Sequence, residues 1–275
     1  MPSIVTHSAA EPGLLVNSYL VDTGDGIAVV DTGLLRSDAL ALRARLDALR
    51  APLRAVFLTH PHPDHVNGTA ELLRGRDVPV HATPAVAAAI AASVEPKRAQ
   101  WGPVYGDEWP TAVVTPTDPV PDGGSVVVGG TTFTVQDCGP AESDADSVWT
   151  ATADGSAVAF VGDVAFSGTH AYLADGHTGR WLDVLDRLEA ELAGVRTLLP
   201  GHGPAAGAEL WHHQRRYLLM VREAVRGRAG DGSLTDADRD ALVATMTRFA
   251  PDAPLSWMVA LGADAVAHEL AGRAA

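Results

Sequence analysis

The chain has 275 residues, of which 47% are apolar and 20% are charged, a composition that excludes extended disorder. Its formal charge of −14 at pH 7 argues against nucleic-acid and membrane-surface partners, because phosphate contacts need clustered basic side chains. The single cysteine, Cys138, excludes an intramolecular disulfide and a structural zinc finger. The sequence shows no signal-peptide pattern and no apolar run of membrane-spanning length, so we expect a cytoplasmic protein.

The first third of the sequence alternates strand and helix patterns. Residues 17–22 and 27–31 are β-rich runs on either side of a Gly/Asp spacer, which predicts a hairpin. The apolar run 55–58 predicts a buried strand that ends abruptly at Thr59. Residues 95–121 are rich in proline and predict a long loop or insert. Its aromatic side chains either form a lid over a site or pack the insert itself; they are Trp101, Tyr105 and Trp109.

The second half repeats the strand pattern and then becomes helical. Strands are predicted at 125–128, 132–136, 148–152, 158–161 and 195–199. From residue 211 onward the pattern is helical, and this apolar part either completes the core or forms a homodimer interface. We therefore expect an α/β (α+β) fold, a four-layer αββα sandwich, over residues 1–205, with a helical extension over 206–275 packed on the same domain.

The segment that follows the strand at 55–58 has the strongest chemical signal. It contains His60, His62, Asp64 and His65 within six residues. Imidazole and carboxylate groups suit a transition-metal cation, and alternate residues of an extended segment point the same way. We therefore expect His60 and His62 to bind one metal ion while Asp64 and His65 face a second.

Two later strands end in further residues of the same kind. Gly162-Asp163 follows one strand, and Pro200-Gly201-His202-Gly203 follows another. A glycine beside each candidate lets the backbone turn tightly. Each signal is weak alone, but with the histidine loop they predict one set of metal ligands.

With these motifs and Asp31-Thr32-Gly33, the sequence resembles the metallo-β-lactamase fold superfamily of metallohydrolases over roughly residues 13–205. The resemblance implies two divalent metal ions at one edge of the αββα sandwich, with zinc as the first expectation and iron or manganese as alternatives. It also implies that Asp31 supports the ligand loop. The implied ligands are His60 and His62 for the first ion, Asp64, His65 and His202 for the second, and Asp163 for both.

One position departs from the superfamily pattern. A third histidine for the first metal usually comes from a Gly-x-x-His-Ser/Thr segment, and Glu142 stands at that place here. We expect Glu142 to bind the metal through its carboxylate, which would shift the metal preference towards iron or manganese. The alternatives are that Glu142 points to solvent and the first site is weak or empty, or that Asp144 or Asp146 substitutes for it.

The resemblance implies a dinuclear metal-dependent hydrolase in which a metal-bound hydroxide attacks an ester, thioester, lactone or related bond of a small molecule. Asp64 is the candidate catalytic residue, because it can orient the water or accept its proton. Asp163 argues against the true β-lactamases, and Phe166 at the place of a tyrosine argues against the acyl-homoserine lactonases. Two rivals remain: a dinuclear-iron oxygenase of the same fold, suggested by Glu142, and a degenerate member without catalytic activity.

Overall fold

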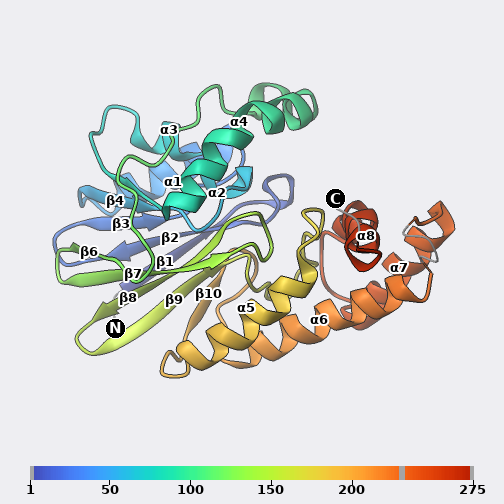
Figure 1. The fold of residues 1–275 in the computed structure, drawn as a ribbon. Helices are drawn as coiled ribbons and strands as arrows, with labels where there is room; N and C mark the ends of the chain where they lie inside the picture. The colour runs from blue at the N-terminus through green and yellow to red at the C-terminus, as the bar shows by residue number, and fades with distance from the viewer. Residues whose placement is uncertain (1–2, 229–232, 273–275) are drawn as a thin grey trace.

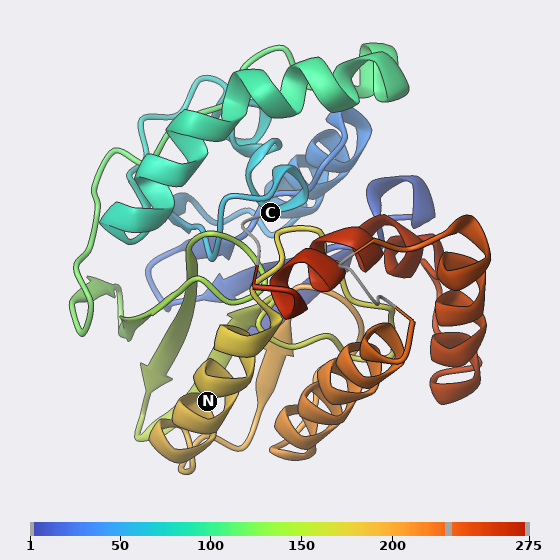
Figure 2. The ribbon, with the colours of Figure 1, turned by 45° about the vertical axis from the view of Figure 1, so that its right-hand side comes forward.

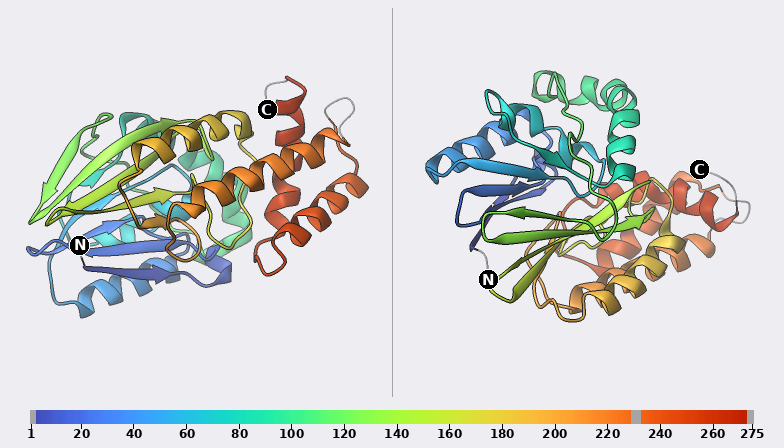
Figure 3. Two further views of the ribbon diagram at one scale, coloured as in Figure 1. Left: turned by 90° about the horizontal axis from the view of Figure 1, so that it is seen from below. Right: turned by 60° about the vertical axis from the view of Figure 1, so that its left-hand side comes forward.

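In the computed structural model, which describes residues 3–228 and 233–272, two five-stranded sheets pack face to face between helical layers (Figure 1). The predicted αββα sandwich is therefore confirmed. The layers are easiest to distinguish in Figure 3, where helices cover the outer side of each sheet. None of the helices in the described ranges combines the length and the apolar character needed to cross a bilayer.

The first sheet has the strand order β1-β2-β3-β4-β5. The β2–β3 hairpin is confirmed, because the Thr23 amide donates to the Gly26 carbonyl at 3.0 Å across the turn. Sequence analysis does not predict β1, an edge strand that has no fully buried side chain. From β3 to β5 the strands are parallel, so their carboxyl ends lie at one edge. The strands are β1 (Ser3–Ser8), β2 (Asn17–Asp22), β3 (Ile27–Val30), β4 (Leu53–Phe57) and β5 (Val80–His81).

The second sheet has the order β10-β9-β8-β7-β6 and is antiparallel except for the β9–β10 pair. That parallel pair brings the ends of β9 and β10, and with them Gly162 and Gly201, to the same edge. The strands are β6 (Ser125–Val128), β7 (Thr131–Gly139), β8 (Asp146–Ala153), β9 (Ser156–Gly162) and β10 (Leu198–Pro200).

Aromatic side chains fill the space between the two sheets. The Phe57 ring stacks on Phe133 with centroids 4.3 Å apart and meets the edge of Trp149 at 4.8 Å. All three are fully buried, and each such ring pair contributes about 1 kcal/mol beyond the area that it buries. Because Phe57 is the last residue of β4, this packing holds the start of the histidine loop firmly against the second sheet.

Helices cover the outer faces of both sheets (Figure 2). On the first sheet, Leu42, Leu46 and Val86 pack against the strands. On the second sheet, one apolar cluster extends over the helices from Trp181 to Val266. The boundary near residue 205 between the core and the helical extension stays a prediction. The helices are η1 (Glu11–Gly13), α1 (Arg36–Ala48), α2 (Pro63–Val66), α3 (Thr69–Leu73), α4 (Pro84–Tyr105), η2 (Gly106–Glu108), α5 (Thr178–Glu191), α6 (Glu209–Arg226), α7 (Asp236–Phe249) and α8 (Trp257–Leu270).

The prediction of a loop over residues 95–121 is wrong for its first part. Helix α4 continues to Tyr105 although it contains Pro96 and Pro103. Trp101 and Tyr105 stand four residues apart on one face of the helix and pack towards Trp109. This tertiary packing outweighs the helix-breaking tendency of the prolines.

Candidate metal centre

The predicted ligands meet at the edge where β4, β9 and β10 end. His60 and His62 follow β4, and the one-turn helix α2 then presents Asp64 and His65 from the same loop. Further residues arrive from three separate turns: Glu142 between β7 and β8, Asp163 after β9 and His202 after β10. Every one of these side chains is buried.

The first group of candidate ligands consists of His60, His62 and Glu142, each offering one ligand atom within 4.8 Å of the others. The His62 Nδ1 atom lies 3.0 Å from Glu142 Oε2, and His60 Nε2 lies 3.7 Å from the same oxygen. Glu142 is 1% exposed, so it does not point to solvent. Asp144 instead pairs with His177 at 2.8 Å, and Asp146 accepts from the backbone amides of 141 and 143. Only Glu142 of these three acids joins the histidines.

The second group consists of Asp64, His65 and His202. The His202 Nε2 atom lies 3.2 Å from Asp64 Oδ2. Asp163 connects the two groups. Its Oδ1 lies 3.3 Å from His65 Nε2, and its Oδ2 lies 3.3 Å from His202 Nε2. With His60 and His65 it also forms a third cluster of candidate ligands. The seven predicted residues thus form one continuous site.

Several ligand atoms in this site have no hydrogen-bond partner among the described residues. They are His60 Nε2, His65 Nε2, both Glu142 oxygens and Asp163 Oδ1. Glu142 and His62 are close but not aligned as a hydrogen bond, the arrangement expected of two ligands that point at a common ion. Because an unpaired buried polar atom is costly, bound cations would remove a penalty that the protein otherwise bears. The residues therefore fit the divalent ions that the fold implies.

Asp31 supports the site from behind, as predicted. Its carboxylate accepts hydrogen bonds from the Thr59 amide at 3.0 Å, from the Thr59 hydroxyl at 2.8 Å and from His65 Nδ1 at 2.8 Å. His60 Nδ1 donates in turn to the Thr59 hydroxyl at 3.0 Å. Both imidazoles therefore carry their proton on Nδ1 and present the lone pair of Nε2 to the centre.

The remaining two histidines are held in other ways. His202 Nδ1 donates to the Leu14 carbonyl at 2.8 Å, which also leaves Nε2 for the centre. His62 is reversed: its Nε2 donates to Asp175 at 3.0 Å, so Nδ1 faces Glu142. Sequence analysis missed Asp175, because an Asp-Gly pair in a loop has the pattern of an ordinary turn and nothing local relates it to His62.

The charges of the site control one another. Burial lowers the pKa of His60 well below its ordinary value, so its neutral form is ready to bind a cation. Burial also acts to lower the pKa of His65, but Asp163 and Asp64 raise it well above its usual range. Burial would raise the pKa of Asp163, yet His202 and His65 hold it well below normal. Protons and metal ions therefore compete for the same histidines.

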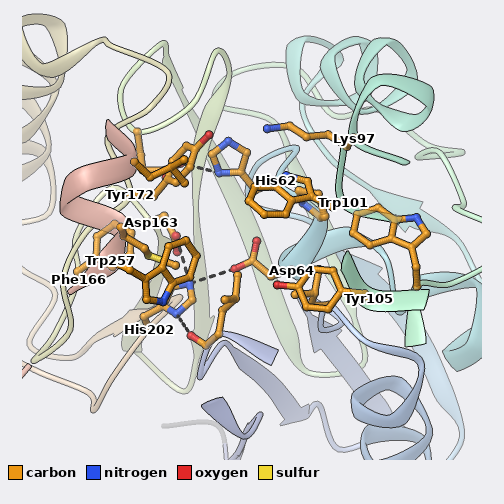
Figure 4. A pocket seen from close by; sticks show the side chains of 17 residues that line it. His62, Asp64, Lys97, Trp101, Tyr105, Asp163, Phe166, Tyr172, His202 and Trp257 are labelled. Atoms are coloured by element: carbon orange, nitrogen blue, oxygen red, sulfur yellow. Dashed lines mark hydrogen bonds and ion pairs between the residues drawn. The ribbon is translucent and has the colours of Figure 1, made fainter. Parts of the chain in front are cut away.

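The centre forms the floor of a cleft (Figure 4). One wall comes from α4 and the residue that follows η2. It contains Trp101, Tyr105 and Trp109, the aromatic residues for which a lid and packing of the insert were the two expectations. The opposite wall comes from α8 and includes Trp257 and Leu261, which are 45% and 40% exposed. The cleft thus combines apolar walls with a polar floor, the usual character of a small-molecule site.

Comparison with known proteins agrees with this geometry. The family model of the metallo-β-lactamase superfamily matches residues 12–202. The chain belongs to this superfamily. The match includes Asp31, the histidine loop, Glu142, Asp163 and His202, and it ends at the last candidate ligand.

Curated relatives match short segments only. The probable metallo-hydrolase YybB of Bacillus subtilis is 37% identical over 67 residues, which cover 24% of this chain and 30% of that protein. Ribonuclease J of Mycoplasma pneumoniae is 32% identical over 82 residues, which cover 27% of this chain and 14% of that protein. The matched segments thus span less than a third of either relative.

Solved structures share the fold. A β-lactamase domain protein from Burkholderia ambifaria is 23% identical with a TM-score of 0.70, covering 97% of this chain and 85% of that one. A B3 metallo-β-lactamase described as having an active-site glutamic acid is 21% identical with a TM-score of 0.59, covering 78% of this chain and 86% of that one. The first of these similarities extends over almost the whole chain, C-terminal helices included.

Proposed function

We propose that this protein is a dinuclear metal-dependent hydrolase that cleaves an ester, thioester, lactone or related bond of a small apolar molecule. The observation that carries the proposal is the meeting of two ligand groups at Asp163 on the floor of an apolar cleft. The site also has its ligand atoms free to bind ions, since several are buried without a partner among the described residues.

In this proposal seven side chains hold the two cations, and one of them, Asp64, also orients water or accepts its proton. One cation is held by His60, His62 and Glu142, the other by Asp64, His65 and His202, and Asp163 lies between them. When bound, the two cations supply Lewis acidity that polarises the substrate and lowers the pKa of a coordinated water towards neutrality. Burial tends to raise the pKa of Asp64, but His65 and His202 lower it below its usual range, so this carboxylate is ionised and able to orient water or accept its proton.

Zinc is the first expectation for the metal, with iron or manganese as alternatives. Glu142 makes the site richer in carboxylate, together with Asp64 and Asp163, and oxygen ligands favour harder metals. The relative described as having an active-site glutamic acid supports a glutamate within a centre of this fold. The same feature motivates a second candidate function, a dinuclear-iron oxygenase.

A small-molecule substrate is preferred over RNA, although ribonuclease J is among the relatives. The described residues lining the cleft include one lysine and no arginine, whereas a backbone-tracking groove needs several basic side chains. The exposed apolar side chains of Trp257 and Leu261 on α8 could contact a second copy of the chain in a homodimer. The small-molecule substrate and the homodimer are both proposals.

Metal content is the decisive experiment. We expect elemental analysis of protein purified without chelator to find about two zinc ions per chain, falling to about one in Glu142→Ala. Asp144→Ala is the matched control, because Asp144 is an exposed acid two residues away that pairs with His177, and we expect it to keep both ions. A panel of esters and thioesters then tests hydrolysis.

The alternative outcomes are equally informative. Two iron ions per chain together with dioxygen consumption would favour the oxygenase. No bound metal after reconstitution would contradict both enzyme proposals and leave the degenerate member. Equal metal loss in Glu142→Ala and Asp144→Ala would show that Glu142 has no special role.

A further inference from the structure

Lys97 is the only lysine in the sequence, and it lines the cleft. It belongs to the last part of α4 and lines both the main cleft and an adjoining groove beside His62. Figure 4 shows its ammonium end on the side of His62 and Tyr172. Lys97 is thus the one lysine or arginine among the described residues that line the cleft and this groove.

The Lys97 ammonium group has no ion pair or hydrogen bond within residues 3–228 and 233–272. Its Nζ atom lies over the Tyr172 ring, 5.9 Å from the centroid. Its charge also acts on Asp175: burial tends to raise the pKa of that carboxyl, but His62 and, less strongly, Lys97 lower it. The next residue, Arg98, differs in this respect: it donates to the Thr111 carbonyl at 3.2 Å and lies 3.8 Å from Glu95. Arg98 thus has a structural use, while Lys97 has no hydrogen bond or ion pair among the described residues and lines the cleft.

The residues around Lys97 indicate what kind of substrate its ammonium group could bind. The apolar walls of the cleft, with Trp101 and Tyr105 on its own helix and Trp257 opposite, suit an acyl chain or an aromatic ring. We propose that Lys97 determines substrate specificity by binding a carboxylate group on an otherwise apolar substrate. The substrate class would then be apolar carboxylic acids that also contain the scissile bond. For the bond that is cleaved, this inference rests on the hydrolase function proposed above.

The local charge favours a monoanion over a phosphate dianion. Asp144 and Asp175 line the same groove as Lys97. One ammonium offers a single positive charge, and two neighbouring carboxylates would repel a second negative charge on the ligand. No arginine lines the cleft or this groove in the described part of the chain, so the planar, two-bond contact typical of phosphate sites is missing.

A binding experiment separates this role from turnover. We would measure the affinity of phenylbutyrate and of its neutral amide, phenylbutyramide, for the metal-loaded protein by calorimetry. In Lys97→Met we expect phenylbutyrate to bind about tenfold more weakly and the amide to bind unchanged, with partial recovery in Lys97→Arg. Arg98→Met is the matched control and should change neither affinity. Equal effects on acid and amide, or no effect on the acid, would overturn the proposal.

Chemical modification gives a second readout, because Lys97 and the α-amino group are the only primary amines of the chain. We expect phenylbutyrate to slow acetylation of Lys97 while the α-amino group reacts at an unchanged rate, as followed by mass spectrometry. Stronger protection by phenyl phosphate than by phenylbutyrate would overturn the preference for a monoanion. Both readouts remain valid if no hydrolysis is found, so failure of the hydrolase proposal is distinguishable from failure of this one.

Discussion

Replacing Asp31 with Asn tests how the fold prepares His65 for metal binding. Asp31 is 2% exposed and its Oδ2 accepts from His65 Nδ1 at 2.8 Å. Asparagine keeps the size of the side chain and tolerates the left-handed backbone of this position, where φ is 57°. Its amide, however, replaces one oxygen with an N–H donor. If that donor faces His65, the imidazole must move its proton to Nε2, the atom that faces the metal centre.

The hydrogen bonds of Asp31 indicate how much metal affinity and stability its replacement should cost. Loss of a partner behind a metal-binding histidine lowers metal affinity about 10- to 100-fold, or roughly 1.4–2.8 kcal/mol. Asp31→Ala removes the acceptor of three hydrogen bonds and leaves the buried Thr59 amide unpaired, which we expect to cost about 3–5 kcal/mol of unfolding free energy. Alanine at this φ adds about 1 kcal/mol of backbone strain.

Two assays measure these quantities separately. Competition with a chromophoric chelator gives the zinc affinity of the wild type and of Asp31→Asn. Urea unfolding of the metal-free protein gives the stability cost of Asp31→Ala. Asp154→Ala is the matched control for the backbone, because Asp154 has φ 50° in an exposed turn between β8 and β9 and lacks a side-chain hydrogen bond among the described residues.

Either of two results would refute the reasoning. Unchanged zinc affinity in a folded Asp31→Asn protein would show that Asp31 does not determine the protonation of His65. A stability loss in Asp154→Ala as large as that in Asp31→Ala would assign the cost to backbone strain instead of the hydrogen-bond network.

Three further substitutions probe other parts of the structure. Asp175→Asn removes the negative charge of the acceptor 3.0 Å from His62 Nε2, so we expect at least about tenfold weaker binding of one metal ion in a zinc titration. Gly201→Ala places a Cβ 2.0 Å from Asp163 Oδ1, so we expect loss of bound metal by elemental analysis and about 1–3 kcal/mol of stability by urea unfolding. Glu269→Ala removes the acceptor that joins α8 to the start of α5, costing about 2–3 kcal/mol on unfolding with metal content unchanged.

Each of these has a control that shares its chemistry. Asp144→Asn neutralises an acid of the same groove without a contact to His62, and Gly194→Ala adds a methyl group where nothing lies within 4 Å. Glu95→Ala removes an exposed glutamate from α4. Metal loss in the first two controls, or equal destabilisation by Glu95→Ala and Glu269→Ala, would contradict the assignments.

The sequence alone was enough to predict the sandwich and the set of candidate ligands. Strand periodicity is a local property, and the ends of the predicted strands carried the polar residues. The histidine loop places four ligand-type residues within six positions, so a short segment already defines half of the centre. Asp31 and Glu142 were found differently, through the resemblance: Asp31 by its place in a shared motif, and Glu142 because it stands where the superfamily usually has a histidine.

The tertiary structure alone decided the surroundings of those ligands. The partner of His62 is Asp175, 113 residues later, and the partner of His202 is the Leu14 carbonyl, 188 residues earlier. Burial of Glu142 against His62 and the placement of Lys97 opposite α8 likewise depend on how distant segments pack. Local patterns cannot reveal such contacts, because the free energy that holds them comes from burying side chains between elements that are far apart in the chain.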